Sequence, residues 1–189
     1  MAIEIERRFL VHEPRAAFAA ATSCHHFTQG YFGGVDGLRI RVRVVSDAGG
    51  DCAALLTFKG MRRGLCRLEY EYPLELDRAR RALITLPSAR IIRKIRYEIH
   101  HHDGLVWSVD RFQDPNNGLV LAEVELTHPD QQVEQPSWVG EEVTFDPRYG
   151  NSRLARFPLP SLPHALGVSA HAGFVNIETG SDGPMPIFS

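Results

Sequence analysis

The 189-residue sequence has few cysteines and no long uninterrupted apolar segment. No stretch approaches the roughly 18 apolar residues that a membrane-spanning helix needs, so we expect no membrane span. The three cysteines, Cys24, Cys52 and Cys66, have no CxxC spacing, which argues against a disulfide framework or a zinc site. Charged residues near the N-terminus leave no apolar core for a signal peptide, so we expect a cytoplasmic protein with free thiols.

A strong charge imbalance is also absent. The formal net charge is −2, so nothing in the overall composition indicates binding to nucleic acid or to an anionic membrane. Apolar residues make up 43% and charged residues 23% of the chain, which is ordinary for a globular domain and excludes a disordered or fibrous protein. The sequence contains neither a P-loop nor a Ser-His-Asp spacing, so no protein nucleophile is apparent.

Alternation of apolar and polar residues over most of the chain is typical of β-strands. Turns rich in glycine and aspartate separate these segments. The expected strands are residues 2–11, 27–33, 37–46, 53–60, 65–74, 89–101, 104–112 and 118–127, with a weaker ninth at 141–145. The expected helices are residues 14–24, 77–86 and about 147–155.

The composition changes after Arg156. Residues 157–189 contain no lysine or arginine and hold five of the twelve prolines. We interpret residues 158–189 as an appended tail, loosely structured or packed on a partner, and not as a second domain.

Charged residues of both signs share one face of the expected strands, because residues two apart in a strand point the same way. In the first strand Glu4, Glu6 and Arg8 alternate with apolar residues such as Ile3 and Ile5. Six of the eight bases on this face are arginine, a bias suited to forked binding of oxyanions. The charged face carries Glu4, Glu6, Glu69, Glu71, Glu98, Asp110, Glu123 and Glu125 together with Arg8, Arg39, Arg41, Arg43, Lys59, Arg67, Lys94 and Arg96.

Two structures explain this pattern, and alternation alone leaves both open. The first is an antiparallel sheet with one buried face and one solvated face. The second is a closed barrel whose interior is the charged face, since about eight strands suffice to hold a small ligand. Such a lumen has to be wet, because unpaired buried ions are very costly. Its acids and bases together suit a polyphosphate bound with a divalent metal.

Short motifs follow one another along the chain in a recognisable order. They are EIERRFL at 4–10, QGY at 29–31, LRIRVR at 38–43, LTFKG at 56–60, RLEYE at 67–71, KIRYE at 94–98, VDRF at 109–112, AEVEL at 122–126 and GEEVTFDPRYGNSRLA at 140–155. The opening motif resembles the ExExK signature of the CYTH superfamily, the triphosphate tunnel metalloenzymes, and the resemblance covers about residues 1–157. It implies a mainly β (α+β) fold, an eight-stranded antiparallel closed β-barrel tunnel with a charged interior and a few helices outside it and plugging one end.

The resemblance also implies roles for the residues on the charged face. Glu69 and Glu71 would orient the bases or bind a second metal. The family usually has lysine where this chain has Arg8, so a planar fork replaces a compact ammonium. The implied metal ligands are Glu4, Glu6, Asp110, Glu123 and Glu125. The implied phosphate-binding bases are Arg8, Arg39, Arg41, Lys59, Arg67, Lys94 and Arg96. The implied catalytic residues are Glu4, Glu6, Arg8, Tyr31, Glu71 and Asp110.

The function implied by the resemblance is divalent-metal-dependent hydrolysis of inorganic tripolyphosphate, with Mg²⁺ or Mn²⁺ as the cofactor. The alternatives are a thiamine triphosphatase or an adenylate cyclase on the same fold, or a non-catalytic module that binds polyphosphate or nucleotide. The expected partner is a small-molecule triphosphate, and we expect no binding to nucleic acid or to a membrane. The sequence also allows a homodimer.

Overall fold

The computed structural model describes residues 2–33 and 37–159, and most of them lie in β-strands. The strands are β1 (Ala2–Val11), β2 (Ser23–Phe32), β3 (Arg39–Asp47), β4 (Gly50–Lys59), β5 (Cys66–Pro73), β6 (Ile91–His100), β7 (Val106–Phe112), β8 (Val120–Glu125) and β9 (Val139–Glu142). The helices are α1 (Pro14–Ala19), α2 (Leu76–Ile84) and α3 (Asn151–Arg156), with 3-10 turns η1 (Ser88–Arg90) and η2 (Pro147–Tyr149). Among the described residues, none of these helices is long and apolar enough to cross a membrane.

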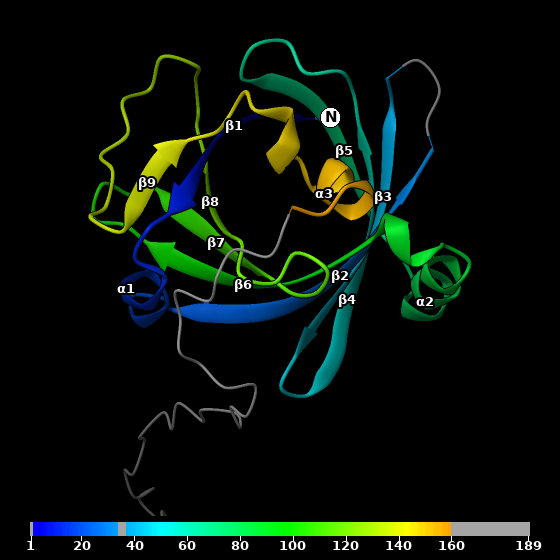
Figure 1. Cartoon of the computed structure of the whole chain (residues 1–189). Helices are drawn as coiled ribbons and strands as arrows, with labels where there is room; N and C mark the ends of the chain where they lie inside the picture. The colour runs from blue at the N-terminus through cyan, green and yellow to red at the C-terminus, as the bar shows by residue number, and fades with distance from the viewer. Residues whose placement is uncertain (1, 34–36, 160–189) are drawn as a thin grey trace, which may run out of the picture.

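Eight of the strands close into an antiparallel barrel, as predicted (Figure 1). Their order around the ring is β5-β4-β3-β2-β6-β7-β8-β1, and pairing of β1 with β5 closes it. The predicted ninth strand is present as β9, which pairs with the second half of β1 while β5 pairs with the first half. The closed ring gives the structure an inside and an outside in place of two open sheet faces.

The prediction of a single helix over residues 14–24 was wrong in its second half. Helix α1 ends at Ala19, and the chain is already extended at Ser23. The reason is pairing with β6: the Thr22 amide donates to the Glu98 carbonyl at 2.8 Å, and Ser23 lies opposite Glu98 in the ladder. Long-range strand pairing therefore outweighs the helix propensity of the alanine-rich segment.

The main hydrophobic core lies outside the barrel. Phe9, Trp107 and Val124 point outward from β1, β7 and β8 and are each at most 1% exposed. Trp138, from the connection that leads into β9, packs edge-on against Trp107 with ring centroids 5.6 Å apart. Both tryptophans are therefore core residues. A second apolar cluster joins β3 and β4 to α2, where Ala79 is fully buried.

At one end of the barrel the inward-facing side chains change from charged to apolar. Ile92, Phe112 and Leu121 lie on the same strand faces as the lumen charges, two residues beyond Lys94, Asp110 and Glu123. Leu154 and Ala155 of α3 pack onto this cluster and are at most 2% exposed. Helix α3 therefore plugs this end, as predicted, and Figure 1 shows it within the outline of the ring.

Candidate active site

The lumen of the barrel is a charged cavity of about 1830 Å³. Residues from β1, β3, β5 and β8 line it, so the charged face of the strands points inward, as the barrel interpretation predicted. Its volume exceeds the roughly 300–1,000 Å³ typical of small-molecule sites. Size therefore does not select between inorganic triphosphate and a nucleotide, and the arrangement of charge is the informative property.

Four carboxylates from β1 and β8 form one side of the lumen, which we call the acidic wall: Glu4, Glu6, Glu123 and Glu125. Glu6 and Glu125 lie directly opposite each other in the β1–β8 ladder, an arrangement that is destabilising for two like charges. Burial raises the pKa of Glu125, and the charges of Glu4 and Glu6 raise it further. Among the described residues, Glu125 has no hydrogen bond or ion pair of its own.

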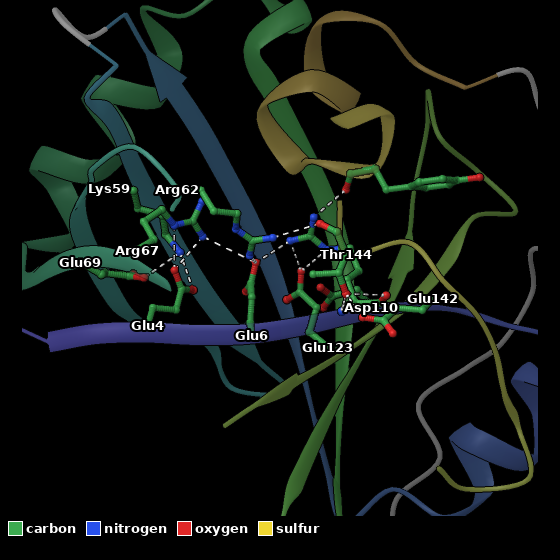
Figure 2. A network of polar contacts seen from close by, with 12 residues as sticks. Glu4, Glu6, Lys59, Arg62, Arg67, Glu69, Asp110, Glu123, Glu142 and Thr144 are labelled. Atoms are coloured by element: carbon green, nitrogen blue, oxygen red, sulfur yellow. Dashed lines mark hydrogen bonds and ion pairs between the residues drawn. The ribbon is translucent and has the colours of Figure 1, made fainter. Parts of the chain in front are cut away.

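Glu4 and Glu6 stand side by side on β1 beneath three bases (Figure 2). Glu4 accepts from Lys59 Nζ at 2.8 Å and from Arg67 Nη2 at 2.6 Å. Glu6 Oε1 accepts from Arg62 Nη2 at 2.6 Å and from Arg8 Nη2 at 3.0 Å. The pKa of Glu6 is nevertheless raised, first by burial and then by the neighbouring Glu123. The bases around Glu6 therefore do not fully offset the effects of burial and of Glu123 on this carboxylate.

Arg8 links the acidic wall to η2, the turn that precedes the plug helix α3. Its Nε donates to Glu123 Oε1 at 2.9 Å, its Nη2 reaches Glu6, and its Nη1 donates to the Tyr149 carbonyl at 3.3 Å. Glu123 also accepts from Arg96 Nη2 at 2.7 Å. Although burial alone would raise it, the pKa of Glu123 lies well below its ordinary value because of these two guanidinium groups. Glu123 is therefore occupied by structural ion pairs.

Lys94 and Asp110 lie beneath the cavity and do not line it. Lys94 is fully buried and Asp110 is 1% exposed, and the lysine Nζ donates to Asp110 Oδ2. Arg96 donates to both oxygens of Asp110, at 2.8 and 2.7 Å, so its carboxylate is occupied on both sides. Burial lowers the pKa of Lys94 to about 7, whereas Arg96 and Lys94 hold the pKa of Asp110 below its ordinary value. This geometry supports a positioning role for both residues more than direct contact with a ligand.

Three arginines of β3 form the basic wall: Arg39, Arg41 and Arg43. The Arg43 guanidinium lies 4.5 Å from the centroid of the Phe27 ring and donates to Gln29 Oε1 at 3.2 Å. Burial, with repulsion from Arg41 and Arg96, lowers the pKa of Arg43 to about 9. Within the described part of the chain neither Arg39 nor Arg43 pairs with a carboxylate, and the buried Arg41 Nε has no hydrogen-bond partner. Two of the three guanidinium groups that line the cavity from the basic wall, those of Arg39 and Arg43, therefore have no carboxylate partner among the described residues.

The remaining two predicted site residues, Tyr31 and Glu71, also line the cavity. The Tyr31 hydroxyl accepts from Gln29 Nε2 at 2.7 Å, and burial raises its pKa to about 12, so the hydroxyl keeps its proton. Glu71 Oε1 accepts from Thr57 at 2.8 Å and from Arg41 at 3.2 Å, while its side chain is 39% exposed. Glu71 is thus held in place by β4 and β3 and remains open to water.

The acidic wall fits a hard divalent cation. Glu6 and Glu125 face each other with raised pKa values, and carboxylate oxygens are the donors that Mg²⁺ and Mn²⁺ prefer. In residues 2–33 and 37–159 no group of three or more acidic, histidine or cysteine side chains is already gathered around one point. Several of these carboxylates instead pair with basic side chains, so each of them would have to release a base in order to coordinate the cation.

Three lumen residues were missing from the predicted site. Arg43 lies on the inward face of β3, where strand alternation placed it without assigning it a role, and Phe27 of β2 packs against its guanidinium. Arg62 belongs to the connection between β4 and β5, where alternation gives no direction. Its contact with Glu6 was therefore not readable from the sequence.

A barrel lumen with carboxylates on one side and arginines on the other defines a site for an anion bound together with a cation. The comparisons agree with this class. The family model for the CYTH domain matches residues 2–157, and the chain belongs to this family.

Similar proteins carry the name inorganic triphosphatase. One from Acetivibrio thermocellus is 39% identical over 158 residues, which cover 84% of this chain and 96% of the relative. Another from Nitrosomonas europaea is 34% identical, over 80% of this chain and 96% of the relative. A solved crystal structure described as an inorganic triphosphatase matches with a TM-score of 0.56 and 30% identity, covering 82% of this chain and 96% of that chain.

Proposed function

We propose that this protein is a divalent-metal-dependent phosphohydrolase that cleaves inorganic tripolyphosphate, with Mg²⁺ or Mn²⁺ as the cofactor. The observation that carries the proposal is the pairing of an acidic wall with an arginine wall across one lumen. The names of the similar proteins support the same activity. A cytoplasmic location remains a prediction from the sequence, which also allows a homodimer.

The chain's carboxylates would hold the metal. Glu4, Glu6 and Glu125 line the cavity and fit this role, whereas Glu123, which also lines it, already accepts from Arg8 and Arg96. When bound, the divalent cation would neutralise charge on the phosphoryl group and lower the pKa of a coordinated water. Asp110 contributes by fixing Lys94 and Arg96, because both of its oxygens already accept from these bases.

The basic wall binds and orients the triphosphate. Arg39, Arg41 and Arg43 supply guanidinium donors, and forked donors match the oxygens of a phosphate. Lys59 and Arg67 hold Glu4 and can turn part of their donors to phosphate when a cation binds that carboxylate. Phosphoryl transfer depends mainly on such positioning and charge stabilisation, because negative charge spreads over the equatorial oxygens of the transition state.

Two further residues serve the hydrolytic step. Tyr31 keeps its proton, because its pKa is about 12, and its hydroxyl can donate to a phosphate oxygen. Glu71 is half open to water and fixed by Thr57 and Arg41, which suits a carboxylate that orients the attacking water. The apolar plug at α3 excludes water from the closed end of the lumen.

A substrate panel tests the proposal. Phosphate release is measured from tripolyphosphate, ATP and thiamine triphosphate, each with Mg²⁺, with Mn²⁺ and with neither ion. We expect metal-dependent release from tripolyphosphate, and loss of that release in a Glu4→Gln, Glu6→Gln double variant that keeps its circular-dichroism spectrum. Preference for ATP or thiamine triphosphate would instead support the other enzymes on this fold, and tight binding without turnover would support a binding module.

A further inference from the structure

Arg62 is a lumen base that no strand carries. It belongs to residues 60–65, the loop between β4 and β5, and its guanidinium reaches across to the acidic wall. Its Nη2 donates to Glu6 Oε1 at 2.6 Å and its Nη1 to the Thr144 carbonyl at 3.0 Å. Figure 2 shows the side chain extending from the loop toward Glu6.

The same carboxylate oxygen has two other arginines around it. Arg8 Nη2 lies 3.0 Å and Arg67 Nη2 lies 3.6 Å from Glu6 Oε1. Burial lowers the pKa of Arg62, Glu6 raises it, and the charges of Arg67 and Arg8 lower it again. Three guanidinium groups therefore share one oxygen, and repulsion among them disfavours the arrangement.

Of these three bases, Arg62 is the one most easily released. Arg8 is also bound by Glu123, and Arg67 donates twice to Glu4. Arg62 has Glu6 as its one carboxylate partner among the described residues.

The loop backbone does not hold Arg62 in place. The neighbouring amides are fixed, because Gly60 N donates to the Leu68 carbonyl at 2.9 Å and Arg63 and Cys66 bond each other at 2.8 and 3.1 Å. The backbone of Arg62 itself makes no hydrogen bond within the part of the chain that the structure describes. Its side chain can therefore leave Glu6 while the ends of the loop stay anchored.

We propose that Arg62 pairs with Glu6 in the metal-free protein, is displaced when a divalent cation binds there, and then donates to the bound triphosphate. The inference rests on the proposed function, because it assigns Glu6 to the metal. Mg²⁺ binds carboxylate oxygen at about 2.1 Å, so a cation on Glu6 would lie close to the guanidinium and repel it. The released guanidinium group faces the lumen, where it can donate charge-assisted hydrogen bonds to the oxygens of a bound triphosphate.

The test compares Arg62→Gln with Arg63→Gln. Both variants remove one positive charge from the same loop, but the Arg63 side chain is exposed and has no hydrogen bond or ion pair among the described residues. Binding of Mn²⁺ alone is measured by calorimetry on metal-free protein. Binding of imidotriphosphate, a slowly hydrolysed tripolyphosphate analogue, is then measured at saturating Mn²⁺.

The two ligands should respond to Arg62→Gln in opposite directions. We expect Mn²⁺ to bind about fivefold or more tightly, the lower end of typical coupling between neighbouring sites, and imidotriphosphate to bind about fivefold or more weakly. Arg63→Gln should change either affinity by less than about twofold, because salt screens an exposed charge. Arg62→Lys keeps the charge and should restore part of the imidotriphosphate affinity.

Several results would overturn the inference. These are equal Mn²⁺ affinity in the two glutamine variants, weaker Mn²⁺ binding in Arg62→Gln, unchanged imidotriphosphate binding, or no Mn²⁺ binding by the wild-type protein. Arg62→Ala removes the same charge and provides the same comparison if the glutamine variant does not fold. Failure of the proposed function would look different, because wild-type protein would bind Mn²⁺ and still release no phosphate from tripolyphosphate.

Discussion

Replacing Glu125 by glutamine should stabilise the metal-free protein and remove its response to metal. Glu125 lies opposite Glu6 in the β1–β8 ladder and has no cation partner among the described residues. A like-charged pair directly opposite costs about 0.2–1 kcal/mol in a sheet, and the exposure of Glu125 places the expected gain in the lower half of that range. At about 2–4 °C per kcal/mol for a domain of this size, the melting temperature should rise by about 1–2 °C.

The stability that Glu125→Gln gains over the wild-type protein should increase as pH rises. Burial and the charges of Glu4 and Glu6 raise the folded-state pKa of Glu125 above its ordinary 4.5. A carboxyl whose folded pKa is raised binds its proton more tightly when folded, so ionising it costs stability as pH rises from the unfolded pKa through the folded one. The advantage of Glu125→Gln should therefore be absent below about pH 4 and grow upward through that window.

Metal should reverse the order of stability. A ligand present at a hundred times its Kd stabilises the folded state by about 2.7 kcal/mol, which corresponds to about 5–11 °C here. If losing this ligand weakens the site a hundredfold, the same Mn²⁺ concentration adds about 0.4 kcal/mol to the variant. Thermal melts with and without Mn²⁺ measure both quantities.

Asp130→Asn is the matched control, because Asp130 is exposed and has no side-chain partner among the described residues. It should follow the wild-type protein both with and without metal. A Glu125→Gln protein that is less stable than wild type without metal, or that gains as much from Mn²⁺, would refute the assignment of Glu125 as a ligand strained by like charge.

Two further predictions concern the structural ion pairs of the lumen. Asp110→Ala should destabilise the fold by about 3–5 kcal/mol in urea unfolding at pH 7, because it removes the buried carboxylate that pairs with Lys94 and Arg96. The loss should shrink toward pH 9, since Lys94 of the wild-type protein, with a pKa of about 7, then sheds its proton and no longer gains from the pair. An unchanged loss at pH 9 would contradict this reasoning. Arg8→Lys should leave turnover unchanged or raise it but lower stability by about 1–3 kcal/mol, because an ammonium cannot span Glu6, Glu123 and the Tyr149 carbonyl together. A melting temperature equal to that of wild type would show that the three contacts contribute nothing.

Strand alternation predicted most of the fold because the period of two sorts side chains by face in any sheet. Thus Glu4 and Glu6 were placed with Arg39 and Arg41 on one face before their strands were known to share a lumen. Alternation did not indicate whether the sheet closes into a barrel, because an open sheet with a solvated face has the same pattern. Closure depends on the long-range pairing of β1 with β5, in which Glu4 lies opposite Arg67.

Neither the depth of a side chain within the lumen nor the direction of a loop side chain could be predicted from the sequence. Lys94 and Arg96 share a face and looked equivalent, yet Lys94 is fully buried beneath the cavity while Arg96 lines it. The difference arises because the apolar plug begins next to Lys94, at Ile92 and Phe112. Arg62 was missed for a related reason, because a loop has no period from which to infer where a side chain points.

The acidic wall and the basic wall each hold charge of one sign that the lumen does not fully neutralise. One kind of ligand would neutralise both. Burial and neighbouring carboxylates raise the pKa values of Glu6 and Glu125, whereas burial and the charges of Arg41 and Arg96 lower the pKa of Arg43 to about 9. A cation alone would satisfy the acidic wall and add positive charge to a lumen that already repels Arg43. A polyphosphate alone would satisfy the arginines and add negative charge near Glu6. Since each ligand cancels the penalty of the other, the geometry favours a polyphosphate that binds together with its metal, and the coupling between the two has to be reciprocal.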